Sequence, residues 1–185
     1  MIIKGEGKKA ILMLHGRGAN AEDIISLHEL FNATSYAITA ENNEWYPKPF
    51  MQQKQENEPK LSQSLKIIHE TTKKIREKHS EVYILGFSQG ACLALEYSAE
   101  NKVNGVIAFS GGLIGQEHEL VKEIKTKKAF ISCSTNDPFI PITRAKKTAE
   151  IYKENQADTK TNFYEGNTHT ITKQEIQEAK EHLGL

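Results

Sequence analysis

The five residues Gly86-Phe87-Ser88-Gln89-Gly90 have the spacing of a tight turn that exposes a reactive serine. They follow the apolar run Val82–Leu85 and begin a segment with helical spacing, Gln89–Glu100, so we expect the serine between a strand and a helix. Side chains two positions before and after such a serine would collide with the crossing elements, and glycine at both positions avoids this. The helix dipole favours negative charge developing at the serine. The pattern therefore predicts Ser88 as a nucleophile.

A serine hydroxyl becomes a good nucleophile only when a neighbouring base accepts its proton and an acidic group orients that base. After a turn of this kind, the expected chain order is an aspartate or glutamate and then a histidine, each following a later strand. Of the three aspartates, only Asp137 follows a predicted strand beyond Ser88, and His169 follows the last predicted strand. Taken singly, Asp137 is typical of a turn before proline and His169 of a surface histidine. Taken together, the three residues predict a catalytic triad.

Hydrolysis through a serine also requires two N–H groups that bind the negatively charged oxygen of the tetrahedral intermediate. One is expected from Gln89, the residue after the nucleophile, and the other from the loop after the first core strand. That loop reads Leu14-His15-Gly16-Arg17-Gly18, and its glycines allow the main chain to approach a ligand closely. We therefore assign the second donor to the Arg17 N–H, and we expect structural roles for the side chains of His15 and Arg17.

Two hydrophobic periods alternate along the chain and predict the elements that position these residues. Short apolar runs predict strands at Ala10–Leu14, Tyr36–Ala40, Val82–Leu85, Gly105–Phe109, Ala129–Cys133 and Thr161–Tyr164. Helical spacing occurs at Asp23–Phe31, Leu61–Ile75, Gln89–Glu100, Thr143–Asn155 and Lys173–Leu183, with a shorter helix expected at Glu117–Lys125. Strands that alternate with helices predict an α/β fold with a parallel sheet covered on both faces. In such sheets the ligand site lies beyond the carboxyl ends of the strands.

Composition and length limit the classes of protein that fit. The chain of 185 residues has 24 Lys and Arg against 24 Asp and Glu. This balance argues against a nucleic acid or an anionic membrane surface as partner, since both require a basic excess. The length predicts one domain over residues 1–185.

The sequence also predicts where the chain resides. Its longest uninterrupted apolar run, Ala10–Leu14, is too short to span a bilayer, and the first residues lack the apolar core of a secretion signal. Cys92 and Cys133 both lie in apolar runs, which is typical of buried thiols in a reducing compartment. We expect a cytoplasmic protein without integral membrane contact.

The glycine-rich loop allows an alternative from another reaction class. Gly16, Gly18 and Ala21 fit the fingerprint of a dinucleotide-binding fold, and Glu41 ends the next predicted strand at about the right distance. A Rossmann-type NAD(P)-dependent oxidoreductase is therefore a second hypothesis, although it leaves the order of Ser88, Asp137 and His169 unexplained.

A third hypothesis is a ligand-binding domain of similar fold without catalysis, since a fold does not determine a function. None of the three His-Glu pairs has a second histidine at the spacing of a zinc helix. We expect neither a metal nor a cofactor.

The chain resembles the phospholipase/carboxylesterase family of small α/β-hydrolases, which includes acyl-protein thioesterases and bacterial carboxylesterases. The resemblance extends along most of the chain and is carried by Leu14-His15-Gly16-Arg17-Gly18, Trp45-Tyr46-Pro47, Gly86-Phe87-Ser88-Gln89-Gly90, Phe109-Ser110-Gly111-Gly112-Leu113, Asp137-Pro138 and His169. It implies an α/β-hydrolase fold with a mostly parallel central sheet of about six core strands, helices on both faces and no lid domain. The family's additional N-terminal strands are expected to be reduced or absent.

The same resemblance implies an activity and a set of site residues. Members of the family hydrolyse carboxylic esters or thioesters through an acyl-enzyme without a cofactor. By this similarity, Ser88 is the nucleophile, His169 the general base and then acid, and Asp137 its orienting group, with Arg17 and Gln89 as oxyanion donors. Candidate residues of the substrate pocket are Trp45, Leu113 and Ile140. A small-molecule ester, a thioester or a lysophospholipid is the implied substrate, and a homodimer is possible by the same resemblance.

Overall fold

A seven-stranded sheet forms the centre of the computed structural model, which describes residues 1–120 and 123–185. Its strand order is β1-β3-β2-β4-β5-β6-β7, with β1 antiparallel to β3 and every other neighbouring pair parallel. The strands are β1 (Ile2–Lys4), β2 (Lys9–Leu14), β3 (Thr34–Ile38), β4 (Glu81–Phe87), β5 (Gly105–Phe109), β6 (Lys128–Ser134) and β7 (Asp158–Tyr164). All six predicted strands overlap observed ones.

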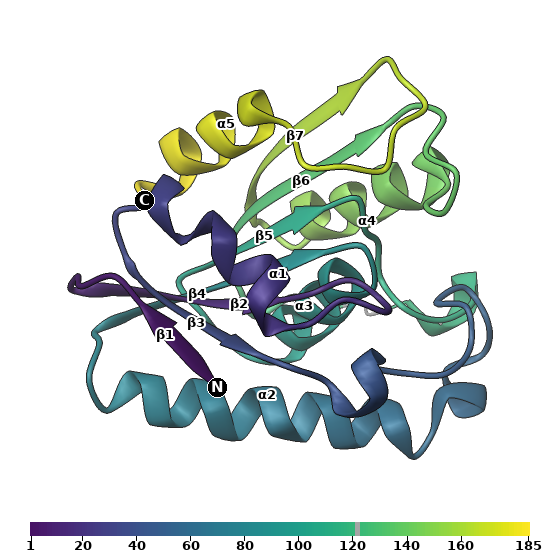
Figure 1. Cartoon of the computed structure of the whole chain (residues 1–185). Coiled ribbons are helices and arrows are strands. Elements are labelled where there is room, and N and C mark those ends of the chain that lie inside the picture. Colours follow the sequence, from purple (N-terminus) through teal and green to yellow (C-terminus); the bar gives the residue numbers. More distant parts are fainter. Residues whose placement is uncertain (121–122) are drawn as a thin grey trace.

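Helices lie on both faces of this sheet (Figure 1). The α-helices are α1 (Ala21–Ile25), α2 (Lys60–Arg76), α3 (Gln89–Glu100), α4 (Ile142–Glu154) and α5 (Lys173–Leu183). Short 3-10 helices are η1 (Ser26–Leu30), η2 (Glu41–Asn43), η3 (Lys54–Asn57) and η4 (Glu117–Glu119). The helix expected at Asp23–Phe31 is therefore divided into α1 and η1. Of the helix expected at Glu117–Lys125, the structure has only η4, and residues 121 and 122 lie outside the described residues.

Each core strand contributes side chains to two separate hydrophobic clusters. In β2, Ala10, Leu12 and Leu14 belong to the cluster beneath α2, α3 and α4, whereas Ile11 and Met13 belong to the cluster beneath α1 and α5. All five of these residues are completely buried. Because both faces are covered, the strands read as continuous apolar runs rather than as alternating ones. Strand β1 was not predicted because it has only three residues, none fully buried, at the sheet edge.

The order of the parallel strands contradicts the Rossmann alternative. Apart from the antiparallel β1, the first strand of the parallel sheet, β2, lies between the second, β3, and the third, β4. A dinucleotide-binding Rossmann sheet has the order 3-2-1-4-5-6, in which the third strand lies beyond the second. Here β3 is added on one side of β2 and β4 on the other, so the order of strand addition reverses at this point and the loops after the parallel strands β2 and β4 meet at the carboxyl edge. The glycine-rich loop after β2 therefore lies beside the Ser88 turn after β4.

None of the helices within the described residues combines the length and the apolar composition that crossing a membrane requires.

Candidate active site

Ser88 occupies a strained turn between β4 and α3. Its backbone has φ 54° and ψ −119°, a conformation that L residues rarely adopt. A Cβ atom at Gly86 would lie 2.2 Å from the carbonyl oxygen of Gly90, and one at Gly90 would lie 2.3 Å from that of Leu14. Both contacts are far inside van der Waals distance. The steric role predicted for the two glycines is confirmed: they allow the strand and the helix to cross closely at the serine.

Asp137 and His169, which are 32 residues apart, form a hydrogen-bonded pair. The Nδ1 atom of His169 lies 2.8 Å from Oδ2 and 3.0 Å from Oδ1 of Asp137. Asp137 follows β6, and His169 lies between β7 and α5. The Asp137 side chain is fully buried, while 14% of the His169 side chain is exposed. With Nδ1–H donated to the carboxylate, the unprotonated Nε2 atom is the basic nitrogen of the ring.

The surroundings of Asp137 keep this residue ionised. Burial by itself raises the pKa of the carboxyl group. The hydrogen bond from His169 and those from the backbone N–H groups of Phe139 and Ile140, each 2.9 Å long to Oδ1, outweigh burial, and the pKa lies below its usual value. The negative charge orients the imidazole and favours its protonated form during a reaction.

The loop that carries His169 is tied to the end of β6, the strand that leads to Asp137. The Ser134 hydroxyl donates to the Thr168 carbonyl oxygen at 2.8 Å, and the Asn136 N–H donates to the Gly166 carbonyl oxygen at 2.9 Å. These bonds hold the histidine against the aspartate.

Glu175 makes a second connection between β6 and the chain that follows His169. Its carboxylate accepts 2.7 Å hydrogen bonds from the Ser132 hydroxyl in β6 and from the Thr172 N–H at the start of α5. Both Glu175 and Ser132 are completely buried. Hydrogen bonds to a buried carboxylate are among the stronger ones in proteins, so this contact fixes the path of the loop.

Two backbone N–H groups are available beside Ser88. In residues 1–120 and 123–185, neither the Arg17 N–H nor the Gln89 N–H donates a hydrogen bond to another group of the protein. Both residues line the same cavity as Ser88. A Cβ atom at Gly16 would lie 3.4 Å from the Ser88 Cβ atom, so the loop after β2 passes directly beside the serine. Free N–H donors at this position suit a ligand oxygen.

The side chain of Arg17 is occupied by the protein itself. Its guanidinium forms an ion pair with Glu44 and donates to the carbonyl oxygens of Tyr46 at 2.8 Å and Pro47 at 3.1 Å. The Gly18 N–H donates to the Asn43 carbonyl oxygen at 2.8 Å. These contacts hold the loop after β2 against the segment after β3, in keeping with the structural role expected for this side chain.

His15 is also structural. Its Nδ1 donates to the Gly16 carbonyl oxygen at 2.7 Å, and its Nε2 accepts from the Ala40 N–H at 3.0 Å. Only a neutral ring with the proton on Nδ1 satisfies both bonds. Burial lowers the pKa of His15, which is completely enclosed. The buried neutral ring supports the first residues of the loop.

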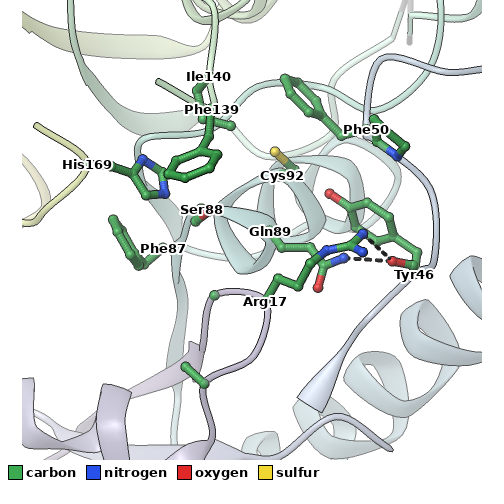
Figure 2. Close-up of a pocket in the computed structure, with 13 residues that line it drawn as sticks. Arg17, Tyr46, Phe50, Phe87, Ser88, Gln89, Cys92, Phe139, Ile140 and His169 are labelled. Atoms are coloured by element: carbon green, nitrogen blue, oxygen red, sulfur yellow. Dashed lines mark hydrogen bonds between the residues drawn. The ribbon is translucent and has the colours of Figure 1, made fainter. Parts of the chain in front are cut away.

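Ser88 lines a cavity of about 460 Å³. Figure 2 shows its side chains, with His169, Phe139 and Phe87 at one end and Tyr46 and Phe50 at the other, on either side of Ser88 and Gln89. Its walls are mostly apolar and consist of Gly16, Arg17, Ala19, Tyr46, Pro49, Phe50, Phe87, Ser88, Gln89, Cys92, Phe139, Ile140 and His169. The predicted pocket residue Ile140 is among them.

The structure corrects the positions predicted for Trp45 and Leu113. Neither is among the described residues that line the cavity. Trp45 is 1% exposed, and its indole N–H donates to the His15 carbonyl oxygen at 2.9 Å. Leu113 is completely buried, and its N–H donates to the Thr148 hydroxyl. Both are therefore packed inside the protein and not in the cavity wall.

Several cavity residues were not predicted from the sequence, among them Tyr46, Phe50, Cys92 and Phe139. A signal existed for Cys92, since it lies four residues after Ser88 and therefore on the same side of the first helical turn. Burial raises the pKa of the Cys92 thiol to about 11, so it is an uncharged wall residue. Phe139 is 68% exposed at the cavity rim, and its ring centroid lies 4.9 Å from that of His169.

The mostly parallel sheet, with its serine turn after β4 and helices on both faces, is the architecture of the α/β-hydrolases. The chain matches the Phospholipase/Carboxylesterase family over residues 2–185. It belongs to this family and is a hydrolase of the phospholipase/carboxylesterase type.

Solved structures with the same architecture include enzymes from bacteria and plants. The phospholipase/carboxylesterase from Dyadobacter fermentans is 38% identical, with a TM-score of 0.90 over 100% of this chain and 95% of that one. The Bacillus cereus carboxylesterase has 19% identity and a TM-score of 0.78, covering 99% and 92% of the two chains. Zea mays acyl-protein thioesterase 2 has 16% identity and a TM-score of 0.81, covering 99% of this chain and 96% of that one. A comparison with curated proteins gave no match.

Proposed function

We propose that this chain hydrolyses carboxylic esters through an acyl-enzyme, with Ser88 as nucleophile, His169 as general base and acid, and Asp137 as the group that orients His169. The observation that carries the proposal is the 2.8 Å hydrogen bond between Asp137 and His169, whose imidazole lines one cavity together with Ser88. Membership in a family of ester hydrolases supports the same reaction class.

The reaction begins when the Ser88 oxygen attacks the ester carbonyl and the His169 Nε2 atom accepts its proton. The negative charge then forms on the carbonyl oxygen, where the N–H groups of Arg17 and Gln89 stabilise it. The resulting imidazolium is stabilised by the ionised Asp137. His169 donates the proton to the departing alcohol, which leaves an acyl group on Ser88. Water repeats the steps and releases the acid.

The walls of the cavity suit an apolar acyl group. Beyond Ser88, the cavity continues between Tyr46, Phe50 and Cys92, which offer mostly apolar surface. A volume of about 460 Å³ is within the range of small-molecule sites. Thioesters react by the same acyl-enzyme steps, so paired oxygen and sulfur esters with acyl chains of increasing length measure both the preferred leaving atom and the preferred acyl length.

Covalent labelling tests this proposal directly. A fluorophosphonate should add one phosphonyl group to the protein, and peptide mapping should place it on Ser88. Ser88→Ala should abolish labelling and lower kcat for a p-nitrophenyl ester by about 10³-fold or more. Ser80→Ala is the matched control, because Ser80 is exposed on the surface. Absence of labelling in the folded protein would instead favour a binding domain without catalysis.

A further inference from the structure

A second cavity adjoins the first at His169. It has a volume of about 330 Å³ and shares four wall residues with the first cavity: Gly16, Ala19, Phe87 and His169. Ser88, Gln89 and Arg17 line only the first cavity, within the described residues. The two cavities therefore meet at His169, and Tyr46 and Phe50 line only the first of them.

The walls of this second cavity are mostly apolar. Ile24 of α1, Leu27 of η1 and Ile171, two residues after His169, form its walls together with Phe87. Asp23, Ser26 and Thr170 also line it and are exposed. His15 is the buried polar residue of the lining, and its two ring nitrogens are already bonded to Gly16 and Ala40. An apolar hollow of this volume accepts part of a small molecule and offers no charged group at its base for an ionic one.

The position of the proton in the proposed reaction decides which part of a substrate reaches this hollow. His169 must donate its proton to the oxygen of the leaving group, so that oxygen lies next to the imidazole when the bond breaks. The carbonyl oxygen lies beside the N–H groups of Arg17 and Gln89, and the acyl carbon lies on Ser88. The acyl chain therefore extends into the first cavity, and the group attached to the leaving oxygen extends past His169.

We infer that the second cavity binds the leaving group, and that the preferred substrates are esters of apolar alcohols. This inference rests on the proposed function, since it uses the direction of proton transfer from His169. The bond that breaks joins the acyl carbon to the alcohol oxygen, the proton comes from His169, and the free alcohol departs through the exposed rim at Asp23 and Thr170. Burial of each additional methylene group of the alcohol should raise kcat/KM about fourfold until the cavity is full.

Two series of esters separate this inference from its alternatives. In the first, the acyl group is acetyl and the alcohol is methyl, propyl, butyl or 2-phenylethyl; in the second, the alcohol is methyl and the acyl chain lengthens. The variant Leu27→Trp fills the second cavity, and Leu30→Trp is its matched control because Leu30 lies in the same 3-10 helix and is 42% exposed.

The expected result is a loss of at least tenfold in the preference of Leu27→Trp for 2-phenylethyl over methyl acetate. Its rate with methyl acetate and the whole acyl series should stay within about threefold of wild type, as should every rate of Leu30→Trp. If Leu27→Trp instead changes the preference for acyl chain length, the second cavity holds the acyl chain and the inference is wrong. Unchanged preferences in both series would overturn it as well.

A second measurement uses the wild-type protein alone. An alcohol bound in the second cavity should compete with water for the acyl-enzyme and form a new ester, with the alcohol proton passing to His169. At equal concentration, 2-phenylethanol should form at least ten times more ester than methanol. Equal yields contradict the inference, whereas absence of both hydrolysis and fluorophosphonate labelling contradicts the proposed function itself.

Discussion

Asp137→Asn is the substitution that separates the role of the carboxylate from the integrity of the fold. In the structure, Oδ1 of Asp137 accepts both backbone hydrogen bonds, from the N–H groups of Phe139 and Ile140. An asparagine keeps this oxygen and replaces Oδ2 with an amide nitrogen that faces Nδ1 of His169. Two N–H donors cannot face each other, so His169 must move its proton to Nε2. The nitrogen that should accept the Ser88 proton then has no free lone pair.

The expected loss of activity follows from this change of tautomer. General base catalysis contributes about 10²–10⁴-fold to a rate, and the wrong histidine tautomer in a triad costs about 10⁴-fold. We therefore expect kcat to fall by about 10³–10⁴-fold, which corresponds to about 4–5.5 kcal/mol of transition-state stabilisation. The melting temperature should change little by comparison, because both backbone hydrogen bonds are retained.

The assay is hydrolysis of a p-nitrophenyl ester, together with the rate of fluorophosphonate labelling and a thermal melt of the same preparation. Asp158→Asn is the control, because it makes the same chemical change on a side chain that is 70% exposed. If the Asp137→Asn protein melts normally and retains more than a tenth of the activity, Asp137 does not orient the base, and the proposed triad is wrong.

Three further substitutions test other parts of the structure. Gly90→Ala places a methyl group 2.3 Å from a carbonyl oxygen at the end of β2. It should lower activity at least tenfold and reduce the free energy of unfolding, measured by urea titration, by about 2 kcal/mol or more. Wild-type activity and stability would contradict the close approach of α3 to β2. Arg144→Met removes the donor of the hydrogen bonds to the carbonyl oxygens of Leu113, at 2.9 Å, and Gly115, at 2.7 Å. The free energy of unfolding, measured in the same way, should fall by about 2–4 kcal/mol, with Arg76→Met on the surface as the control. Burial lowers the pKa of His15, so near pH 6.5 the unfolded chain binds a proton that the folded protein does not, and stability should be full above that pH and decrease below it. His15→Asn should flatten this part of the plot of melting temperature against pH. Equal slopes for the variant and the wild-type protein would contradict this prediction.

Local signals sufficed for most elements because the core strands are buried on both faces. Runs such as Gly105–Phe109 have no polar side, and this is the pattern of a parallel strand between two layers of helices. Helix α5 was predicted with its observed bounds, since it has an amphipathic period and ends at Gly184, whose φ is 72°. The short β1 had no such signal, because it is held by pairing with β3 rather than by a buried face.

The chemistry of the candidate site was predictable from residue types and order, whereas the shape of its pocket was not. Ser88, Asp137 and His169 were singled out because each follows a strand, and parallel strands end at one edge of the sheet. Trp45 and Leu113 were expected in the pocket wall, yet both are buried and neither lines the cavity. The segment from Tyr46 to Phe50 contributes the wall instead, and its path depends on the contacts of the Arg17 guanidinium with Glu44 and the Tyr46 carbonyl oxygen.

The sequence by itself determined the alternation of strands and helices, the serine turn and the order of the candidate triad, because periodicity and close steric contacts act over a few neighbouring residues. Only the tertiary structure decided which side chains face the ligand and that two cavities meet at His169. Side-chain direction in loops is set by contacts between distant segments, such as Ser134 with Thr168, and these contacts leave no periodic signal in the chain.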